Sequence, residues 1–236
     1  MFISSRKRNV VRHYLDVDPS KNSDAKLKVF FISDIHRRKV DQKLLKKINE
    51  DIDVVIIGGD LAEKNVPFSR IEKNVQNLSQ LGQVFFVWGN NDREVGESEI
   101  RKIIARYDGI ILDNANSPIP GQPLWGICGT DDPSCRMVNV EAALQNIERY
   151  QNVLFVSHQP RVWEKIEQHI EPEMMFAGHT HGGQIRIGKY GIDQKGYFEN
   201  NHGKGKLISN GYGTSTVPFR LGAPAECHII TLSFKE

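Results

Sequence analysis

The first hundred residues alternate short apolar runs with amphipathic segments. The runs 27–33, 54–59 and 84–89 are rich in β-branched and aromatic residues, and each ends in a turn that contains Asp, Gly or Asn. Between these runs, the segments 41–50 and 71–81 space their apolar residues three or four positions apart, which is typical of one helix face. Strands alternating with helices predict an α/β fold.

The second half of the chain continues this alternation of strands and helices, and then the sequence pattern changes. It is predicted to contain two further strands, 152–157 and 174–177, and two helices, 140–150 and 163–170. After residue 184 the chain is rich in glycine and in short β-type runs, which predicts a second sheet built mainly from hairpins. No internal repeat or linker interrupts the pattern, so we expect one domain over residues 27–236.

Composition excludes several classes of protein. With 236 residues, 39% of them hydrophobic and 25% charged, the chain can bury a sizeable core and does not resemble a disordered protein. The formal net charge of +2 gives no general attraction to nucleic acid, so we expect no nucleic-acid partner. Cys128, Cys135 and Cys227 form no C-x-x-C pair, which predicts reduced thiols and a cytoplasmic location.

Residues 1–26 are expected to form a basic N-terminal arm. Arg6, Lys7, Arg8 and Arg12 cluster there, with no acidic residue before Asp16. One interpretation is a solvated arm. The other is a peripheral contact with anionic lipid headgroups, or a stretch beside a membrane anchor that is absent from this chain. The chain itself contains no run of about 18 apolar residues that would span a membrane.

Polar residues with metal-binding side chains follow five of the predicted strands. They are Asp34 and His36, then Asp60, then Asn90, Asn91 and Asp92, then His158, and finally His179 and His181. Each motif alone has an ordinary explanation, because Asp60 could cap a helix and Asn90 could shape a turn. Open α/β sheets, however, bind ligands at the carboxyl ends of their strands, so the combination predicts one site.

Together these residues resemble the calcineurin-like metallophosphoesterases. That family has the pattern D-x-H, G-D, G-N-H-[DE], a lone His and G-H-x-H, and here the pattern reads Asp34-x-His36, Gly59-Asp60, Gly89-Asn90-Asn91-Asp92, His158 and Gly178-His179-x-His181. The resemblance covers roughly residues 27–234. The segments "GHTHGGQIRI" and "NGYGTSTVPFRLGAPAE" are similar to the branch labelled UDP-2,3-diacylglucosamine pyrophosphohydrolase-like. The resemblance to this family implies a four-layer α/β/β/α sandwich of two mixed sheets.

The resemblance also implies two divalent metal ions. One would be held by Asp34, His36, Asp60 and His181, and the other by Asp60, Asn90, His158 and His179, with Asp60 bridging them. Mixed oxygen and nitrogen ligands suit Mn²⁺, with Fe or Zn²⁺ as further candidates. Such a centre would hydrolyse a phosphodiester or a pyrophosphate by metal-bound hydroxide, with Asn91 and Asp92 as catalytic residues.

Asn91 departs from the family pattern, which has His at this position. An amide can donate a hydrogen bond to a phosphoryl oxygen, but it cannot transfer a proton at neutral pH. This favours substrates with an acidic leaving group, such as pyrophosphates or activated diesters, on a phosphorylated small molecule or a lipid-linked compound. Two alternatives stay open: Asn91 only shapes the turn, or His202 supplies the proton.

Three arginines are candidates for substrate contacts. Arg37 and Arg38 directly follow the D-x-H turn, and Arg220 lies in the glycine-rich tail. Two other functions remain possible for the same fold: a catalytically weak metal-binding scaffold or regulatory protein, and a nuclease. The complete set of seven metal ligands argues against the scaffold, and the near-neutral charge argues against the nuclease.

Overall fold

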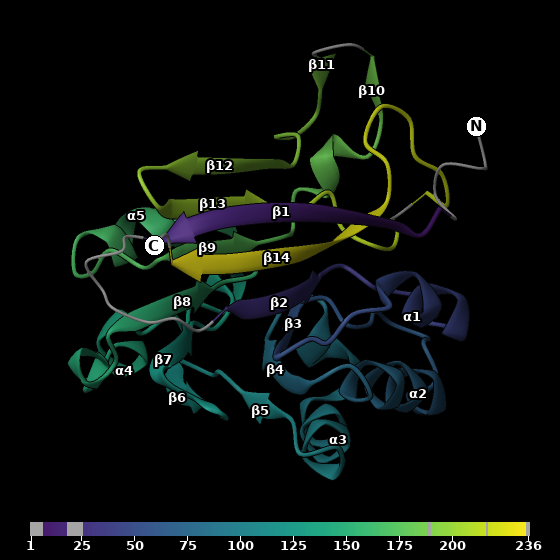
Figure 1. Cartoon of the computed structure of the whole chain (residues 1–236). Helices are drawn as coiled ribbons and strands as arrows, with labels where there is room; N and C mark the ends of the chain where they lie inside the picture. Colours follow the sequence, from purple (N-terminus) through teal and green to yellow (C-terminus); the bar gives the residue numbers. More distant parts are fainter. Residues whose placement is uncertain (1–6, 18–25, 188–189, 216, 235–236) are drawn as a thin grey trace.

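Two six-stranded mixed sheets pack face to face, and helices cover their outer faces (Figure 1). The computed structural model describes all residues except 1–6, 18–25, 188–189, 216 and 235–236. Within the described chain the layers are helix, sheet, sheet and helix, so the predicted four-layer sandwich is confirmed. A small antiparallel pair, β10 (Arg186–Ile187) and β11 (Tyr190–Gly191), stands apart from both sheets.

The first sheet has the order β1-β14-β2-β3-β4-β5. Its strands are β1 (Asn9–Val17), β14 (Glu226–Phe234), β2 (Leu27–Ile32), β3 (Val54–Gly58), β4 (Gln83–Val87) and β5 (Ile110–Ile111). The four strands from β2 to β5 run parallel, whereas β14 is antiparallel to β2 and parallel to β1. The parallel strands therefore bring their carboxyl ends to one edge.

The second sheet has the order β12-β13-β9-β8-β7-β6. Its strands are β12 (Tyr197–Asn201), β13 (Lys204–Ile208), β9 (Met174–Ala177), β8 (Asn152–Val156), β7 (Gln122–Gly129) and β6 (Ala115–Ile119). The four central strands are parallel, and only β12 and β6 pair antiparallel at the two edges. The prediction of a sheet made mainly of hairpins is therefore wrong, because β13 joins β9 by a parallel crossover and β14 returns to the first sheet.

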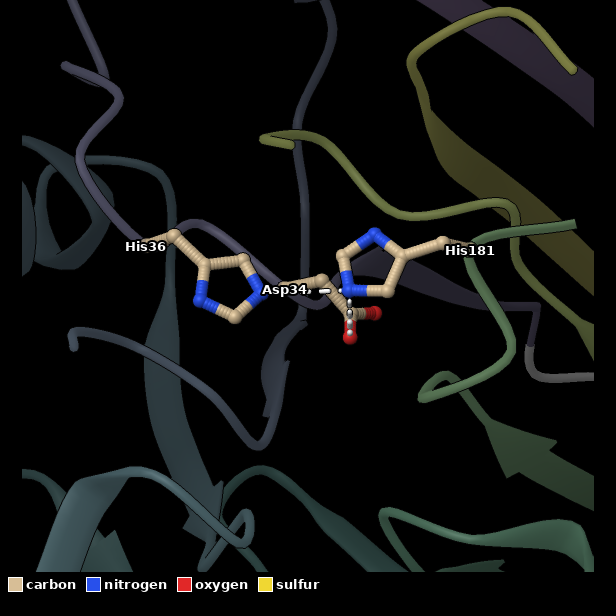
Figure 2. Close-up of side chains that lie close together, drawn as sticks. All are labelled: Asp34, His36 and His181. Carbon is tan, nitrogen blue, oxygen red and sulfur yellow. Dashed lines mark hydrogen bonds and ion pairs between the residues drawn. The ribbon is translucent and has the colours of Figure 1, made fainter. Parts of the chain in front are cut away.

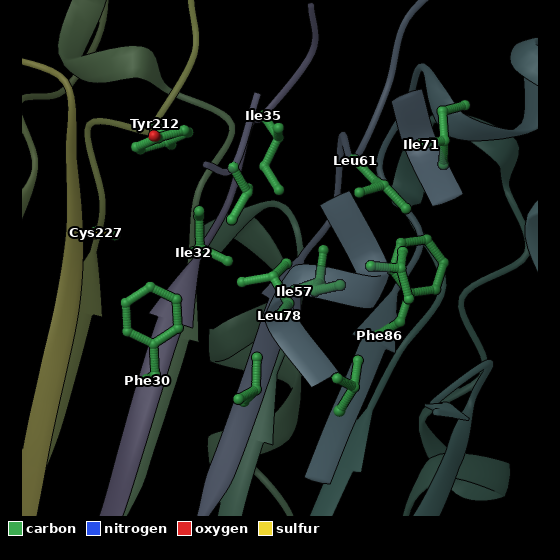
Figure 3. Packing of buried hydrophobic residues seen from close by; sticks show 14 of the residues in the cluster. Phe30, Ile32, Ile35, Ile57, Leu61, Ile71, Leu78, Phe86, Tyr212 and Cys227 are labelled. Atoms are coloured by element: carbon green, nitrogen blue, oxygen red, sulfur yellow. The ribbon is translucent and has the colours of Figure 1, made fainter. Parts of the chain in front are cut away.

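Side-chain alternation along the strands builds two separate cores on the first sheet. In β2, Val29 and Phe31 face the second sheet, whereas Phe30 and Ile32 face the helices. The helices on this outer face are α1 (Gln42–Ile48), α2 (Phe68–Ser79) and α3 (Asp92–Arg106), and Figure 3 shows their core. A strand buried on both faces needs apolar residues at every position, which explains its continuous run.

Two predictions about the chain are corrected by the structure. Residues 9–17, assigned to the basic arm, form β1, which pairs with β14 in register from Asn9 to Val17. The sheet therefore begins before residue 27. The helix predicted over 140–150 is shorter: α4 (Val140–Ala143) ends early, and a 3₁₀ turn follows over Ile147–Arg149. Asn146 between them takes a left-handed backbone with φ of 56°, which a helix cannot continue through.

His228 makes the stability of this fold depend on pH. The ring is buried on β14, 3.1 Å from the ring of His13 and 3.0 Å from Ser209 Oγ, and burial lowers its pKa to about 3. An unfolded histidine takes up a proton near pH 6.5, whereas the folded one stays neutral until far lower pH. The unfolded state therefore gains protons first, and stability is lost as pH falls below about 6.5.

We expect His228→Asn to remove this part of the pH dependence. Between pH 6 and pH 4 the free energy of unfolding should fall less steeply, by up to about 1.4 kcal/mol per pH unit. Denaturant unfolding at a series of pH values measures the slope. The control is His169→Asn at an exposed position, which should keep the wild-type slope. Equal slopes in all three proteins would show that His228 does not carry the effect.

Candidate active site

The predicted metal ligands from five strands meet at one edge of the sandwich. Asp34 and His36 follow β2, Asp60 follows β3 and Asn90 follows β4, all in the first sheet. His158 follows β8, and His179 and His181 follow β9, both in the second sheet. Three of the five strands therefore belong to one sheet and two to the other. The facing arrangement of the two sheets is what brings the seven side chains together.

Asp34, His36 and His181 form the first compact group (Figure 2). The Nε2 atom of His181 lies 3.3 Å from Oδ1 of Asp34 and 3.2 Å from Nε2 of His36. All three side chains are buried or nearly so. Each thus offers one donor atom to the same small volume, which is the arrangement that a metal ion requires.

Asp60 lies between this group and the ligands of the second sheet. Its Oδ2 atom is 3.7 Å from Nε2 of His36 and 3.5 Å from Nε2 of His158. Donor atoms of Asp34, Asp60 and His158 form a second group, within 4.8 Å of one another. Asp34 therefore belongs to both groups, while Asp60 stands at the position from which a carboxylate could contact two ions.

Asn90 and His179 extend the second group. The Oδ1 atom of Asn90 lies 3.0 Å from Nδ1 of His179, and that nitrogen lies 3.3 Å from Nε2 of His158. His179 thus turns its Nδ1 toward the centre, whereas His36, His158 and His181 turn their Nε2 atoms inward. The rings of His158 and His179 meet edge to face, with centroids 5.0 Å apart.

Partners outside the centre hold three of these rings in orientation, and for His181 the partner is Arg220, whose Nη2 atom lies 3.1 Å from Nδ1 of the ring. Nδ1 of His158 lies 2.9 Å from the carbonyl oxygen of Gly58 and donates to it, so Nε2 is the nitrogen directed inward. Oε2 of Glu63 lies 3.2 Å from Nδ1 of His36. A carboxylate behind a ligating histidine fixes the ring and raises its basicity. Glu63, three residues after the G-D motif, was not among the site residues predicted from the sequence.

Most of the ligands hold an unusual backbone conformation. Five of them have positive φ: Asp34 at 53°, His36 at 51°, Asp60 at 51°, His179 at 70° and His181 at 49°. The left-handed region costs a non-glycine residue roughly 1–2 kcal/mol. Such strain persists only where the surrounding structure imposes it, and it concentrates at functional sites. The strand ends are therefore bent specifically to aim these side chains.

The glycines of the G-N and G-H motifs leave room for ligands on neighbouring strands. A Cβ atom on Gly89 would lie 2.2 Å from Oδ1 of Asp60, and one on Gly178 would lie 2.5 Å from Oδ2 of Asp34. Neither distance is compatible with a side chain. Each glycine thus makes space for a carboxylate that comes from an adjacent strand or from the opposite sheet.

Burial and mutual charge set the ionisation of the centre. Burial of His158 lowers its pKa, but the charges of Asp60 and Asp34 outweigh burial and raise the pKa to about 10. Burial raises the pKa of Asp60, and His158 and His36 outweigh it and hold that pKa well below its usual value. Burial lowers the pKa of His181 to about 4. Asp34 and Asp60 are therefore carboxylate anions, and a proton on His158 offsets part of their negative charge.

The donor set fits divalent metal ions. Two buried carboxylates, an amide oxygen and four imidazole nitrogens converge, and carboxylate with imidazole suits Mn, Fe and Zn. Ring nitrogens lie 3.2 Å apart in the pair His36 and His181 and 3.3 Å apart in the pair His158 and His179, and a cation between them would stabilise each pair once its inward nitrogens are unprotonated. Binding would require the proton on His158 to leave, so metal affinity falls with falling pH.

Asn91 and Asp92, the two predicted catalytic residues, both make contacts to Asp60 in the structure. Asn91 donates its side-chain amide to Oδ2 of Asp60 at 2.7 Å and its backbone N–H to Oδ1 at 2.9 Å. Asp92 is fully buried and accepts backbone N–H groups of Gly89, Asp60 and Ala62 at 2.8–3.1 Å. Through these hydrogen bonds Asp92 links the turn after β3 to the turn after β4. Its side chain is therefore occupied by backbone N–H groups, a contact that orders the turn carrying Asp60.

The three arginines that were predicted to contact the substrate lie in different environments in the structure. Arg220 is fully buried and donates to the carbonyl oxygens of His181, Gly213 and Ala223, so it braces the site from behind and is not available to a substrate. Arg38 stacks on the ring of Tyr212 and donates to that residue's carbonyl oxygen. Only Arg37 is largely exposed, with 70% of its side-chain surface accessible and an ion pair to Glu63.

His202 is excluded as a proton source by the topology. It precedes β13, whose first residues pair with the start of β9, whereas His179 follows the end of β9. His202 thus lies at the opposite edge of the second sheet.

Asp132 is a buried carboxylate near the site that was not predicted from the sequence, because the strand before it, β7, was not predicted either. It accepts from Nε2 of Gln159, the neighbour of His158. The signal was available, because "GTDD" follows an apolar run.

Comparisons with known proteins agree with this geometry. Residues 27–183 match the family described as calcineurin-like phosphoesterase. The chain is 40% identical over 236 residues to the uncharacterized protein YpbG of Bacillus subtilis (strain 168), a match that covers 98% of this chain and 90% of YpbG. It is 26% identical over 194 residues to the phosphodiesterase YaeI of Escherichia coli (strain K12), covering 75% of this chain and 68% of YaeI.

Among solved structures, TT1561 of Thermus thermophilus has the same fold. It superposes with a TM-score of 0.55 at 13% sequence identity, and the match covers 79% of this chain and 90% of TT1561. The fold, the match over most of the chain and the site define a metal-dependent phosphoesterase. The chain belongs to the calcineurin-like phosphoesterase family.

Of the helices in the described residues, none has the length and hydropathy to cross a bilayer.

Glu63 should control metal affinity through His36. Glu63→Ala removes the carboxylate behind the ring, and loss of such a partner typically costs about 10–100-fold in metal affinity. Glu63→Gln keeps the shape without the charge and should fall between wild type and Glu63→Ala. Titration with Mn²⁺, followed calorimetrically, measures the effect. Glu99→Gln, at a surface ion pair with Lys102, is the control and should bind as wild type does. Unchanged affinity in Glu63→Ala would contradict this role.

Proposed function

We propose that the protein uses two divalent metal ions to hydrolyse a pyrophosphate or a phosphodiester with an acidic leaving group. The observation that carries the proposal is the position of Asp60, whose Oδ2 atom lies within 3.7 Å of one histidine from each sheet. A carboxylate there can bridge two ions, which in two-metal hydrolases sit about 3.5–4 Å apart. Mn²⁺ is the metal we expect, because the donors are mixed oxygen and nitrogen.

The two ligand sets divide around Asp60. We assign Asp34, His36 and His181 to one ion, and Asn90, His158 and His179 to the other. When bound, such ions lower the pKa of a water molecule and offset the charge that develops on the phosphoryl oxygens. The protein's own contribution is orientation: Gly58 and Glu63 fix two rings, and Asp92 fixes the turn that carries Asp60.

Asn91 supports the preference for an acidic leaving group. Its amide donates to Asp60 and cannot transfer a proton, so nothing at this position protonates a departing alkoxide. A phosphate or an activated alcohol leaves without such help. The relative YaeI is named a phosphodiesterase, which supports ester or anhydride hydrolysis as the class of reaction. The substrate would be a phosphorylated small molecule or a lipid-linked compound.

Contact with a membrane surface is a separate proposal, and it depends on few residues. Arg8 pairs with Asp41 and Arg12 pairs with Glu50 at 3.0 Å, so both guanidinium groups already have partners inside the fold. Arg6 lies outside the described residues. We propose that a contact with anionic headgroups would depend on Lys7 and on the residues before it, which favours weak, salt-sensitive binding.

The bridging assignment predicts different metal losses in two variants. Asp60→Ala should lose both ions, because Asp60 is the ligand assigned to each, whereas His36→Ala should mainly empty one position. Elemental analysis of the purified variants, with circular dichroism to confirm folding, measures the ratio of metal to protein. The assignment would be wrong if Asp60→Ala retained the wild-type metal content. Activity in all forms should vanish with a chelator.

Replacement of Asn91 by His tests the leaving-group argument. Asn91→His should improve kcat/KM for an alkyl phosphodiester, whose alkoxide needs a proton, by about 10²-fold or more. On a pyrophosphate or a 4-nitrophenyl diester the gain should be small. The measurement is kcat/KM for both substrate classes in wild type and variant at saturating Mn²⁺. Equal acceleration of the two classes would overturn the argument and leave the two-metal assignment intact.

A further inference from the structure

A basic pocket of about 360 Å³ is formed by the loops after β7 and β8, and the second of these loops also carries His158. Arg136, Arg161 and Lys165 line it together with the apolar residues Pro133, Val138 and Val162. No Asp or Glu belongs to its lining within the described residues. The volume is at the small end of the range typical of ligand sites. We define this set of residues as the basic pocket.

The three cations of the basic pocket are not used by the fold. Within the part of the chain that the structure describes, Arg136, Arg161 and Lys165 make no ion pair and no side-chain hydrogen bond. The whole chain carries a net charge of only +2, so this concentration of positive charge is local. Cations that converge on a hollow without acidic neighbours raise the local concentration of anions.

Two other pockets of similar size lack this property. In one, Lys204 and Lys206 pair with Glu173 and Glu167 across the rim. In the other, between α1 and α2, Arg70 donates to a backbone carbonyl and Lys73 to Gln76. These four cations have partners within the protein, and carboxylates line both pockets: Asp41 in the pocket between α1 and α2, and Glu167, Glu171 and Glu199 in the other. The basic pocket differs because its charges are left for a ligand.

The basic pocket is joined to the metal-binding edge by a short hydrogen-bonded connection. Gln159 follows His158 directly, and its Nε2 atom donates to both carboxylate oxygens of Asp132 at 3.0 Å and to Oγ of Ser134 at 2.9 Å. This contact ties the loop after β7 to the loop after β8. Arg136 lies on the first loop, Arg161 lies on the second, and Lys165 follows on α5 (Trp163–Glu167).

We propose that the basic pocket binds a second phosphate group of the substrate, one that is not hydrolysed. This inference rests on the proposed function and specifies its substrate class: a phosphodiester or pyrophosphate that carries a further phosphomonoester group. Two guanidinium groups and one ammonium can each donate charge-assisted hydrogen bonds to such a dianion. The further phosphate could belong to a soluble compound or to a lipid headgroup.

The first test measures binding without catalysis. Inorganic phosphate is titrated calorimetrically into the full chain in the presence of a chelator, so that the metal centre does not compete for it. The variant combines Arg136→Asn, Arg161→Gln and Lys165→Gln; Asn is chosen because residue 136 has a φ of 55°, which Asn tolerates. The control combines Lys26→Gln, Lys43→Gln and Lys46→Gln, which removes the same charge from exposed positions elsewhere.

We expect the pocket variant to bind inorganic phosphate at least about tenfold more weakly than wild type, because charged hydrogen bonds are lost. The control should bind as wild type does. Equal binding by wild type and pocket variant would overturn the inference, whatever the enzyme hydrolyses. Loss of binding with no hydrolysis of any diester would retain the anion site and reject the proposed function.

The second test uses two 4-nitrophenyl diesters with Mn²⁺ present, one with a plain second alcohol and one whose second alcohol carries a phosphomonoester. The leaving group is the same in both. The pocket variant should raise KM about tenfold for the phosphorylated diester only, with kcat nearly unchanged. An equal change for both diesters would reject the assignment. Binding to phosphatidic acid vesicles that is lost in the pocket variant would identify a lipid headgroup as the source, and vesicle binding equal to wild type would identify a soluble one.

Discussion

The site depends on one constraint: donor atoms from two separate sheets must meet within a few ångströms at a single edge. The core between the sheets fixes this, because residues such as Phe31 and Phe176 stack across it with ring centroids 5.2 Å apart. A sheet that slid or tilted would separate His181 from Asp34, which lie 3.3 Å apart. Close packing permits no such movement without loss of contacts. The sandwich therefore serves as a rigid support for chemistry at its rim.

Within that frame, local strain and close approach complete the geometry. Five ligands have positive φ, and each conformation is held by neighbours: Asp34 accepts the backbone N–H of His179, and Asp60 accepts that of Asn91. Glycines 89 and 178 are needed because a carboxylate occupies the space of their missing Cβ atoms. The free energy stored in these turns is offset by the packed strands that precede them. At the strand ends, the conformations that aim the ligands therefore lower stability, whereas the packing of the core both stabilises the fold and supports the site.

Several residues act through others. Asp92 orders the turns, Glu63 orients His36, and Arg220 anchors the loop of His181, although none of these side chains is directed at a reacting group. Asn91 donates to Asp60 where the family has a histidine, and under the proposed function this would make the chemistry of the leaving group the main determinant of rate. The basic pocket adds a second determinant if it selects substrates by a remote phosphate, because binding energy far from the reaction can be used for orientation.

The sequence by itself predicted the class of fold and the seven candidate ligands, because buried parallel strands have continuous apolar runs and their ends carry Asp, Asn and His. It could not show that β8 and β9 belong to the opposite sheet, since strand order is a long-range property. Residues 9–17 were misjudged because β1 is half exposed and finds its partner β14 more than two hundred residues later. Only the tertiary structure decided that Arg220 is internal, that Asp92 faces backbone N–H groups and that Glu63 supports His36. Side-chain direction after a turn depends on φ and on packing, and neither is encoded in the spacing of residues along the chain.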